Sequence, residues 1–260
     1  DFRAHRIVRF TLSENGAGFA AKHEGDFIRS SNVTFRPIDV KQGPDGALYI
    51  ADWSNPIIQH GEVDFRDPRR DKVHGRIWRV TFKGRSLVKK QNFRLMKNAT
   101  LFDVLKTDNQ YDKRQARRVL HERGKEVLKD LPKWSAKERG EQAKLEALWL
   151  YEALDVENFK LLQDMLSDAD DPRIRAAAVR VLSHWGERIP DVRRMKMLNA
   201  LVSDEHPRVR LEAIRALSQI KNETSANIAL KTLDKPMDRF LDYGLWLTMN
   251  DLAEPFVRGM

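Results

Sequence analysis

Two proline-led segments in the second half of the sequence are closely similar: "PRIRAAAVRVLSHW" at residues 172–185 and "PRVRLEAIRALSQI" at residues 207–220. They share 7 identical residues in 14 positions and begin 35 residues apart. Internal similarity at such a period is the sequence signature of a solenoid, in which each repeat packs against its neighbours. We therefore predict that the second half of the chain is a helical repeat array.

Each proline-led segment has the pattern of an amphipathic helix. Pro172 and Pro207 suit a first helical turn, because the N–H that proline lacks would have no partner there. The apolar residues of the first segment follow helical spacing and predict one buried stripe: Ile174, Ala177, Ala178, Val181, Leu182 and Trp185. A shorter helix is predicted after each segment, over residues 191–202 and 223–233.

Helix pairs of this length and pattern resemble HEAT repeats. Residues 141–166 look like a preceding, more degenerate pair, and residues 235–252 look like the start of a following one. In HEAT-like repeats the arginine after the proline often bonds to the neighbouring repeat, which implies a structural role for Arg175 and Arg210. Three tryptophans are predicted to pack in the core or between repeats: Trp149, Trp185 and Trp246. HEAT solenoids carry function on a concave surface, whose side chains the sequence does not identify.

The first half of the sequence has the alternation of β-strands. "HRIVRFTL" at residues 5–12 predicts a strand, and the turn-rich "SENGAG" that follows predicts a hairpin. Residues 35–53 hold two strand-like runs around a turn at residues 43–46, where proline presets φ and glycine tolerates positive φ. Residues 75–84 predict another strand, which makes about five strands in this half. A propeller is one architecture that buries such sheets.

The amino-acid sequences of these segments resemble those of one protein family. "FRPIDVKQGPDGALYIADWSNPIIQHGEVDFRDPRRDKVHGRIWRVT", at residues 35–81, is similar to the end of the propeller in PVC-type membrane-bound dehydrogenase-like, haem-binding proteins, relatives of the glucose/sorbosone dehydrogenase superfamily. "DEHPRVRLEAIRALS" and "FLDYGLWLTMNDL" are similar to the helical region that follows there. The resemblance implies the last blade or blades of a β-propeller followed by an α-helical HEAT-repeat solenoid.

This resemblance also implies a division of the chain into three parts. Residues 1–85 would be the terminal propeller blade region, residues 86–110 a linker with a short helix, and residues 111–260 the HEAT-like repeats. The clearest repeats are predicted at residues 171–203 and 206–235.

The function that the resemblance implies would require domains of a parent protein in addition to this chain. Family members are long extracytoplasmic proteins, periplasmic or membrane-associated, and commonly end in a cytochrome-like domain with a c-type haem. This chain is expected to be an internal fragment whose partners are the rest of the propeller and that cytochrome domain. Some relatives oxidise sugars or alcohols with pyrroloquinoline quinone and calcium. The implied function is therefore sugar oxidation by the parent protein, with this piece alone inactive.

A charged loop, residues 60–76, lies between two predicted strands. If it faced the channel of a propeller, His60 or His74 would be the candidates for a catalytic base. The candidate ligand-binding or interdomain residues are Asp52, Asp64, Arg66, Asp67, Arg69, Arg70, Asp71 and Arg76. In the alternative interpretation these charges neutralise one another and brace the loop as exposed ion pairs. No metal site is predicted, because the two histidines are fourteen apart without a thiolate and the carboxylates lack calcium-loop spacing.

Composition excludes several classes of site. The 260 residues are 41% apolar and contain no cysteine, which excludes disulfides, thiolate zinc sites, a cysteine nucleophile and covalent c-type haem in this chain. No apolar stretch approaches the length of about 18 residues that a membrane span needs. The first residues lack the pattern of a signal peptide, so an extracytoplasmic location is implied only by the resemblance.

Two further functions remain as alternatives. The HEAT region could be a non-catalytic protein-interaction scaffold. The formal charge of +9 could instead serve nucleic-acid binding, although most basic residues are interleaved with acidic ones. That second alternative requires five arginines to share one face: Arg173, Arg180, Arg188, Arg193 and Arg194.

Overall fold

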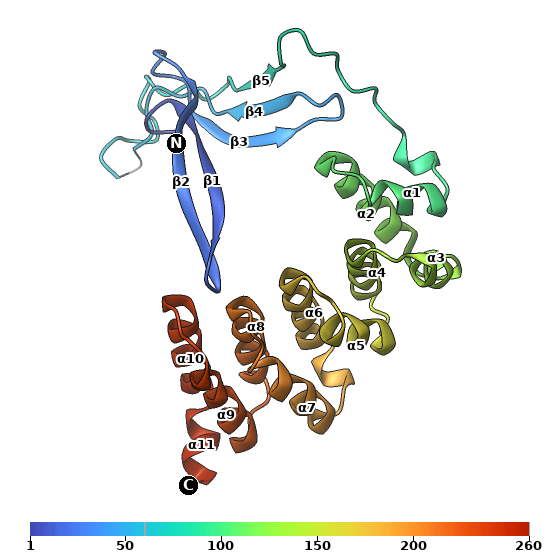
Figure 1. The fold of residues 1–260 in the computed structure, drawn as a ribbon. Coiled ribbons are helices and arrows are strands. Elements are labelled where there is room, and N and C mark those ends of the chain that lie inside the picture. Colours follow the sequence, from blue (N-terminus) through green and yellow to red (C-terminus); the bar gives the residue numbers. More distant parts are fainter. Residues whose placement is uncertain (60, 260) are drawn as a thin grey trace. The chain divides into compact units, whose positions relative to one another are not determined.

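The structure is a computed structural model that describes residues 1–59 and 61–259. The chain divides into two compact units (Figure 1). The β unit consists of residues 1–13, 20–95 and 109–114, and the helical unit consists of residues 14–19, 96–108 and those from 115 onward. Residues 14–19 include the turn of the first hairpin and the strand ends beside it, and by their contacts they belong to the helical unit.

The described part of the β unit contains two separate sheets. Strands β1 (Arg6–Asn15) and β2 (Gly18–Arg29) form a two-stranded sheet. Strands β3 (Pro37–Gln42), β4 (Leu48–Asp52) and β5 (Arg76–Val80) form a three-stranded sheet in that order. Both pairs of the second sheet are antiparallel, with Val40 and Trp78 on either side of Ile50.

The hairpin predicted over residues 35–53 is confirmed as β3 and β4. The turn between them closes through a hydrogen bond from the amide of Gly46 to the carbonyl of Gly43, at 3.1 Å. Gly46 has a φ of +79°, a left-handed conformation that glycine adopts without a steric penalty. The buried centre of this sheet is Ile50, with Phe35 and Ala47 beside it in the core.

The prediction that residues 1–85 form the last blade or blades of a β-propeller is wrong. A propeller blade is a four-stranded sheet, whereas the described residues form one sheet of two strands and one of three. Alternating apolar residues predict where strands form, and five strands are present there. Which strands pair depends on contacts between residues far apart in sequence, and the alternation carries no information about those contacts.

The helical unit begins with short helices. After η1 (Phe93–Leu95), which belongs to the β unit, come α1 (Asn98–Val104), α2 (Gln110–Arg123), whose residues up to Arg114 also belong to the β unit, η2 (Gly124–Lys129) and α3 (Leu131–Lys137). Within the described residues, no helix of the chain has both the length and the apolar character that crossing a bilayer requires.

Four helix pairs follow and form the solenoid. Their first helices are α4 (Glu141–Ala153), α6 (Pro172–His184), α8 (Pro207–Leu217) and α10 (Arg239–Asp251). Their second helices are α5 (Phe159–Ser167), α7 (Asp191–Leu201), α9 (Glu223–Leu230) and α11 (Ala253–Gly259), with 3-10 turns η3 (Gly186–Arg188) and η4 (Lys231–Asp234). The first helices pack on one another in sequence order and form one layer, and the second helices form another (Figure 1).

The predicted helical stripe and the arginine contacts are confirmed. On α6 the stripe is buried except for Ala177, which is half-buried, and Trp185 at its end has no exposed surface. Arg175 donates to the Asp204 carboxylate at 2.9 Å. Arg210 donates to the carbonyl of Pro236 at 2.6 Å. Each arginine therefore links its own repeat to the next one along the chain.

The three tryptophans have different environments. Trp185 is fully buried, as predicted, and lies edge-on to Phe159 with ring centroids 6.1 Å apart. Trp149 is half-buried beneath the guanidinium of Arg117, 5.4 Å from its ring centroid. Trp246, on α10, differs from the prediction because 59% of its surface is exposed.

Candidate functional site

The predicted site residue at the end of β4 is a buried hydrogen-bond centre. Asp52 accepts hydrogen bonds from the backbone amides of Arg36 and Ser54, at 2.8 and 2.9 Å, and from the indole of Trp78 at 2.8 Å. Arg76 forms an ion pair with it at 3.0 Å. Burial acts to raise the pKa of Asp52, but these hydrogen bonds and the Arg76 charge outweigh it and lower the pKa. The side chain thus joins the start of β3, the end of β4 and the first half of β5.

Arg70 holds the backbone of the charged loop. The side chain is 9% exposed, and its guanidinium donates to the carbonyls of Asp64 and Val63, at 2.9 and 2.8 Å, and to that of Gln59. It also lies over the ring of Phe65, 5.5 Å from the centroid. These contacts use the donors that would otherwise meet a ligand.

The other carboxylates of the loop are used within its own turns. Asp67 accepts two hydrogen bonds from the guanidinium of Arg69, at 2.8 and 2.9 Å, and these bonds together with the Arg69 amide lower the pKa of Asp67 to about 2. Asp71 accepts from the amides of His74 and Val73, which lowers its pKa as well. Asp64 accepts from the backbone amide of Arg66 at 2.6 Å.

Of the two candidate bases, the structure describes His74, which is exposed. The His74 side chain is 76% exposed, and its Nδ1 lies 3.1 Å from the Asp71 carboxylate. His60 lies outside the described residues. Among the residues that the structure describes, no group of three or more histidine, aspartate or glutamate side chains is placed to hold a metal ion. A ligand role for the charged loop stays a prediction.

A different site lies in the helical unit, where the hairpin turn meets α8 and α10. Ala17, with no exposed surface, donates its amide hydrogen to Asp238 Oδ2 at 2.7 Å. Its carbonyl accepts a hydrogen bond from Arg208 Nη1 at 3.1 Å. The helices therefore bind both backbone groups of one residue, which is the way a protein recognises main chain and not a particular side chain.

Two glycines make this approach close enough. Gly16 has a φ of +59°, and a Cβ there would lie 2.1 Å from Asp238 Oδ2. A Cβ on Gly18 would lie 2.6 Å from the ring of Phe240. The sequence predicted a hairpin turn here but not its contact with the helices. The sequence signal for that contact was the pair of glycines on either side of Ala17. A two-residue turn does not require a glycine at both of these positions, so the second glycine indicates a close approach of another segment.

The Asp238 carboxylate accepts two kinds of hydrogen bond at the start of α10. Its Oδ1 accepts hydrogen bonds from the amides of Phe240 and Leu241, at 2.8 and 3.0 Å, which caps the helix, while Oδ2 binds Ala17. Burial acts to raise the pKa of Asp238. The hydrogen bonds from the three amides and the charge of Arg210 lower this pKa by more than burial raises it, so the net shift is downward. The carboxylate stays ionised next to the positive end of the helix dipole.

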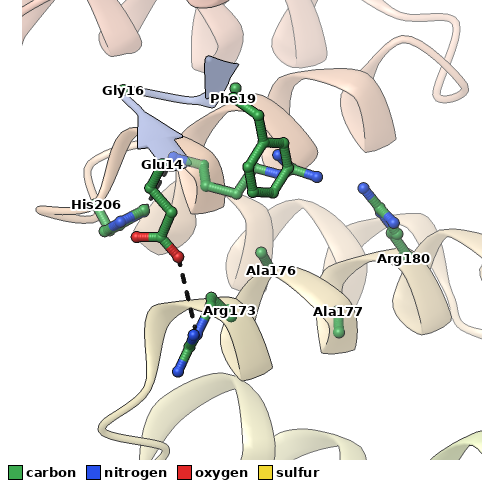
Figure 2. A pocket seen from close by; sticks show the side chains of 10 residues that line it. Glu14, Gly16, Phe19, Arg173, Ala176, Ala177, Arg180 and His206 are labelled. Atoms are coloured by element: carbon green, nitrogen blue, oxygen red, sulfur yellow. Dashed lines mark hydrogen bonds and ion pairs between the residues drawn. The ribbon is translucent and has the colours of Figure 1, made fainter. Parts of the chain in front are cut away.

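A pocket of about 160 Å³ adjoins the hairpin turn (Figure 2). Its floor is Ala176 and Ala177 of α6, and Phe19 forms one wall. The guanidinium of Arg208 lies over the ring of Phe19, 4.9 Å from the centroid, in a cation–π arrangement. The remaining lining residues are Glu14, Gly16, Gly18, Arg173, Arg180 and His206.

The positive charges around the pocket are compensated in place. Glu212 of α8 is 4% exposed and is bonded to Arg180, which belongs to α6. The same carboxylate lies 3.2 Å from Arg215 and 3.6 Å from Arg208. Arg173 is paired with Asp171 at 2.7 Å. A nearly neutral, alanine-floored pocket suits a protein side chain better than a polyanion.

The arginines proposed for nucleic-acid binding are also paired. Besides Arg173 and Arg180, Arg188 is bonded to Asp155 and Glu157, and Arg194 is buried beside Asp191. Nucleic acid is bound by cations that replace counterions on the phosphates. Four of the five arginines already have a carboxylate partner, which weakens the nucleic-acid alternative.

Replacing Asp238 with alanine is expected to free the amide of Ala17. The substitution removes its acceptor and the cap of α10, so the Ala17 amide should exchange with solvent on the order of tenfold faster or more, and helix stability should fall by about 1 kcal/mol. Residue-resolved hydrogen exchange measures both. Asp234→Ala, an exposed aspartate four residues earlier, is the matched control. An unchanged Ala17 exchange rate would contradict the described contact.

Comparison with known proteins divides the chain in a similar way. Residues 159–242 match HEAT repeats, which confirms the HEAT prediction for α5 to the start of α10. Residues 3–84, which contain β1 to β5, match a domain of unknown function, DUF7133. No curated protein matches the chain. Residues 159–242 of the helical unit are thus HEAT repeats, and the match for the β unit gives no support to a dehydrogenase-like propeller.

Proposed function

We propose that this protein is an interaction scaffold whose HEAT helices bind a segment of a partner protein at the pocket beside the hairpin turn. The observation that carries the proposal is the binding of Ala17 through its backbone amide and carbonyl by Asp238 and Arg208. The site therefore already binds one protein segment, its own turn. The pocket next to that turn is where a side chain of a second segment would enter.

The geometry supports a small apolar side chain as the group that enters. Ala176 and Ala177 offer only methyl groups, and Phe19 adds an aromatic wall. Arg173 and Arg180 stand at the rim with side chains 70% and 55% exposed, so they can donate to carbonyl oxygens of the same segment without losing their carboxylate partners. Solenoids commonly bind extended segments on such continuous helical surfaces.

The comparisons support the scaffold alternative over sugar oxidation. HEAT repeats match the residues that form the site on α6 and α8. Neither match supports a redox function. The quinone, the cytochrome partner and the extracytoplasmic location are implied only by the resemblance in the sequence, so the proposal does not use them.

A photo-crosslinking side chain placed at position 173, on the exposed rim of the pocket, tests this function without filling it. In the full chain, exposed to extract of its native cells, it is expected to form an adduct with a partner protein. Excess unlabelled wild-type chain should abolish the adduct, whereas excess Ala177→Trp variant, whose pocket is filled, should not. The matched control carries the crosslinker at the exposed position Lys196 of α7.

Two results would overturn the proposal. One is the absence of any adduct at position 173 that the wild-type chain displaces. The other is equal displacement by the wild-type chain and by the Ala177→Trp variant, since competition would then not involve the pocket. Circular dichroism of the variant confirms that its helices are intact before the comparison is made.

A further inference from the structure

A second pocket of the helical unit, the lysine pocket, lies between α1 and α3 and has a volume of about 370 Å³. Two aromatic rings form most of its apolar wall. Phe102 of α1, which is buried, stacks on the half-buried Trp134 of α3 with ring centroids 4.9 Å apart and planes inclined by 22°. Asn98 of α1 donates its side-chain amide to the carboxylate of Asp130, just before α3, at 2.8 Å. These two contacts join the two sides of the pocket.

Three lysines give this pocket its charge and its name. Lys97 immediately precedes α1, and Lys133 and Lys137 belong to α3. All three are exposed. Lys133 and Lys137 are four positions apart on one helix, so their like charges lie side by side and repel each other. In the part of the chain that the structure describes, no carboxylate lies within ion-pair distance of any of the three ammonium groups.

The acidic residues around the lysine pocket have other partners. Glu138, which follows α3, is paired with Lys106 at 3.1 Å. Glu126 of η2 is paired with Lys129 at 2.5 Å. Asp130 lines the pocket and accepts the hydrogen bond from the Asn98 amide described above. The pocket beside the hairpin turn is nearly neutral because its arginines have carboxylate partners, whereas the lysine pocket keeps an excess of positive charge.

We propose that the lysine pocket binds an acidic segment of a partner protein. Carboxylates of the segment pair with the ammonium groups of Lys97, Lys133 and Lys137, and an apolar side chain between them contacts the exposed part of Trp134. Lysine suits this ligand because its ammonium is a mobile point charge that needs no bidentate geometry. The lysine pocket shares no residue with the pocket beside the hairpin turn, so it is a second binding site on the helical unit.

The arrangement of charge favours a short acidic segment over a long polyanion. Nucleic acid is bound through a series of cations that follow its phosphates, and anionic membranes are recognised by clusters of about four to eight basic residues. Here three lysines gather around one pocket, and the carboxylates of Glu126, Asp130 and Glu138 lie next to them in the sequence or in space. These carboxylates would repel a polyanion that extended beyond the pocket, whereas an acidic peptide places its charges at the lysines alone.

A fluorescein-labelled peptide with one leucine between two runs of glutamate is a suitable probe. Titrated with the full chain at low ionic strength, it is expected to bind saturably, as measured by fluorescence anisotropy, and more weakly as salt screens the charges. The double substitution Lys133→Gln with Lys137→Gln should weaken binding on the order of tenfold, because two of the three cations are lost. Both lysines are exposed, so the variant should fold normally, which circular dichroism confirms.

Two matched controls separate the pocket from the net charge of the chain. The double substitution Lys125→Gln with Lys196→Gln removes the same charge from exposed positions outside the pocket, and it should leave the affinity nearly unchanged. A peptide with serine in place of leucine should bind about fivefold more weakly, because the apolar contact with Trp134 is lost.

Several outcomes would overturn this assignment. Absence of saturable binding would do so, as would equal affinities of the peptide for the two double variants or equal affinities of the leucine and serine peptides. A single-stranded oligonucleotide or a phosphatidylserine vesicle that bound more tightly than the peptide, through Lys133 and Lys137, would assign the pocket to that anion instead. None of these substitutions touches the pocket beside the hairpin turn, so failure here is distinguishable from failure of the photo-crosslinking experiment at position 173.

Discussion

Replacing Arg210 with alanine is expected to lower the free energy of unfolding of the helical unit by about 3 kcal/mol. Arg210 is 2% exposed on α8. Its guanidinium donates to the carbonyls of Asp204 and Glu205, at 2.8 and 3.0 Å, and to that of Pro236 in the following repeat at 2.6 Å. Alanine would leave these carbonyls without their charged donor and would open a cavity between the repeats.

Hydrogen exchange along α8 and α10 measures this effect in the intact chain. A loss of about 3 kcal/mol corresponds to exchange on the order of 100-fold faster in amides that open with the unit. Arg215→Ala is the matched control, because Arg215 lies on the same helix with its side chain 62% exposed. If the Arg210 variant exchanged no faster than this control, the inter-repeat role of Arg210 would be refuted.

Replacing Asp52 with alanine is expected to destabilise the β unit by about 3 kcal/mol. The carboxylate is the common acceptor for two backbone amides and the Trp78 indole, and it is the counter-ion of Arg76. Alanine would leave these buried donors without an acceptor and Arg76 without its counter-ion. An unsatisfied buried donor costs more than the hydrogen bond itself contributes.

Exchange of the amides in β3 to β5 measures the loss, with Asp39→Ala as the matched control. Asp39 lies in the same sheet, on β3, but its carboxylate is exposed and accepts hydrogen bonds from Lys41 and from the amide of Val40. Its removal should leave the exchange rates unchanged. Comparable rates in the two variants would show that Asp52 does not hold the sheet together.

The acid dependence of the β unit provides a second measurement of the same residue. The pKa of Asp52 is lower in the folded state than its ordinary value of about 3.9. The ionised carboxylate therefore contributes its full stabilisation above the ordinary pKa, and this contribution is lost as the pH falls through the lower folded-state pKa. Asp52→Asn should flatten this part of the stability profile below about pH 4.

The charged loop illustrates how far residue types can predict a site. Its sequence suggested either a ligand site or a neutralised loop. In the structure Arg70 binds three loop carbonyls, and Asp67 and Asp71 accept from their own turn residues. The same charged residue types are compatible with both interpretations, so the sequence could not distinguish them. Only the positions of the carbonyls and amides reveal that these side chains organise backbone.

The site beside the hairpin turn could not be predicted in the same way. Ala17 and Asp238 are 221 residues apart in sequence, and neither is unusual in its own segment. Trp246 was predicted to pack against a neighbour from its helical position alone. In the structure 59% of its surface is exposed, because helical spacing does not reveal which elements pack against α10.

The resemblance to HEAT repeats implied the arginines that join successive repeats. The sequence by itself determined the helical repeats, their prolines and the buried stripe of α6. These features follow from spacing within a helix and from similarity at an offset of 35 residues, and both kinds of information are local or periodic. Only the tertiary structure decided that the strands form two separate sheets and that the turn around Ala17 meets α8 and α10. Those contacts join residues with no regular separation in sequence, so their pairing depends on how whole elements pack.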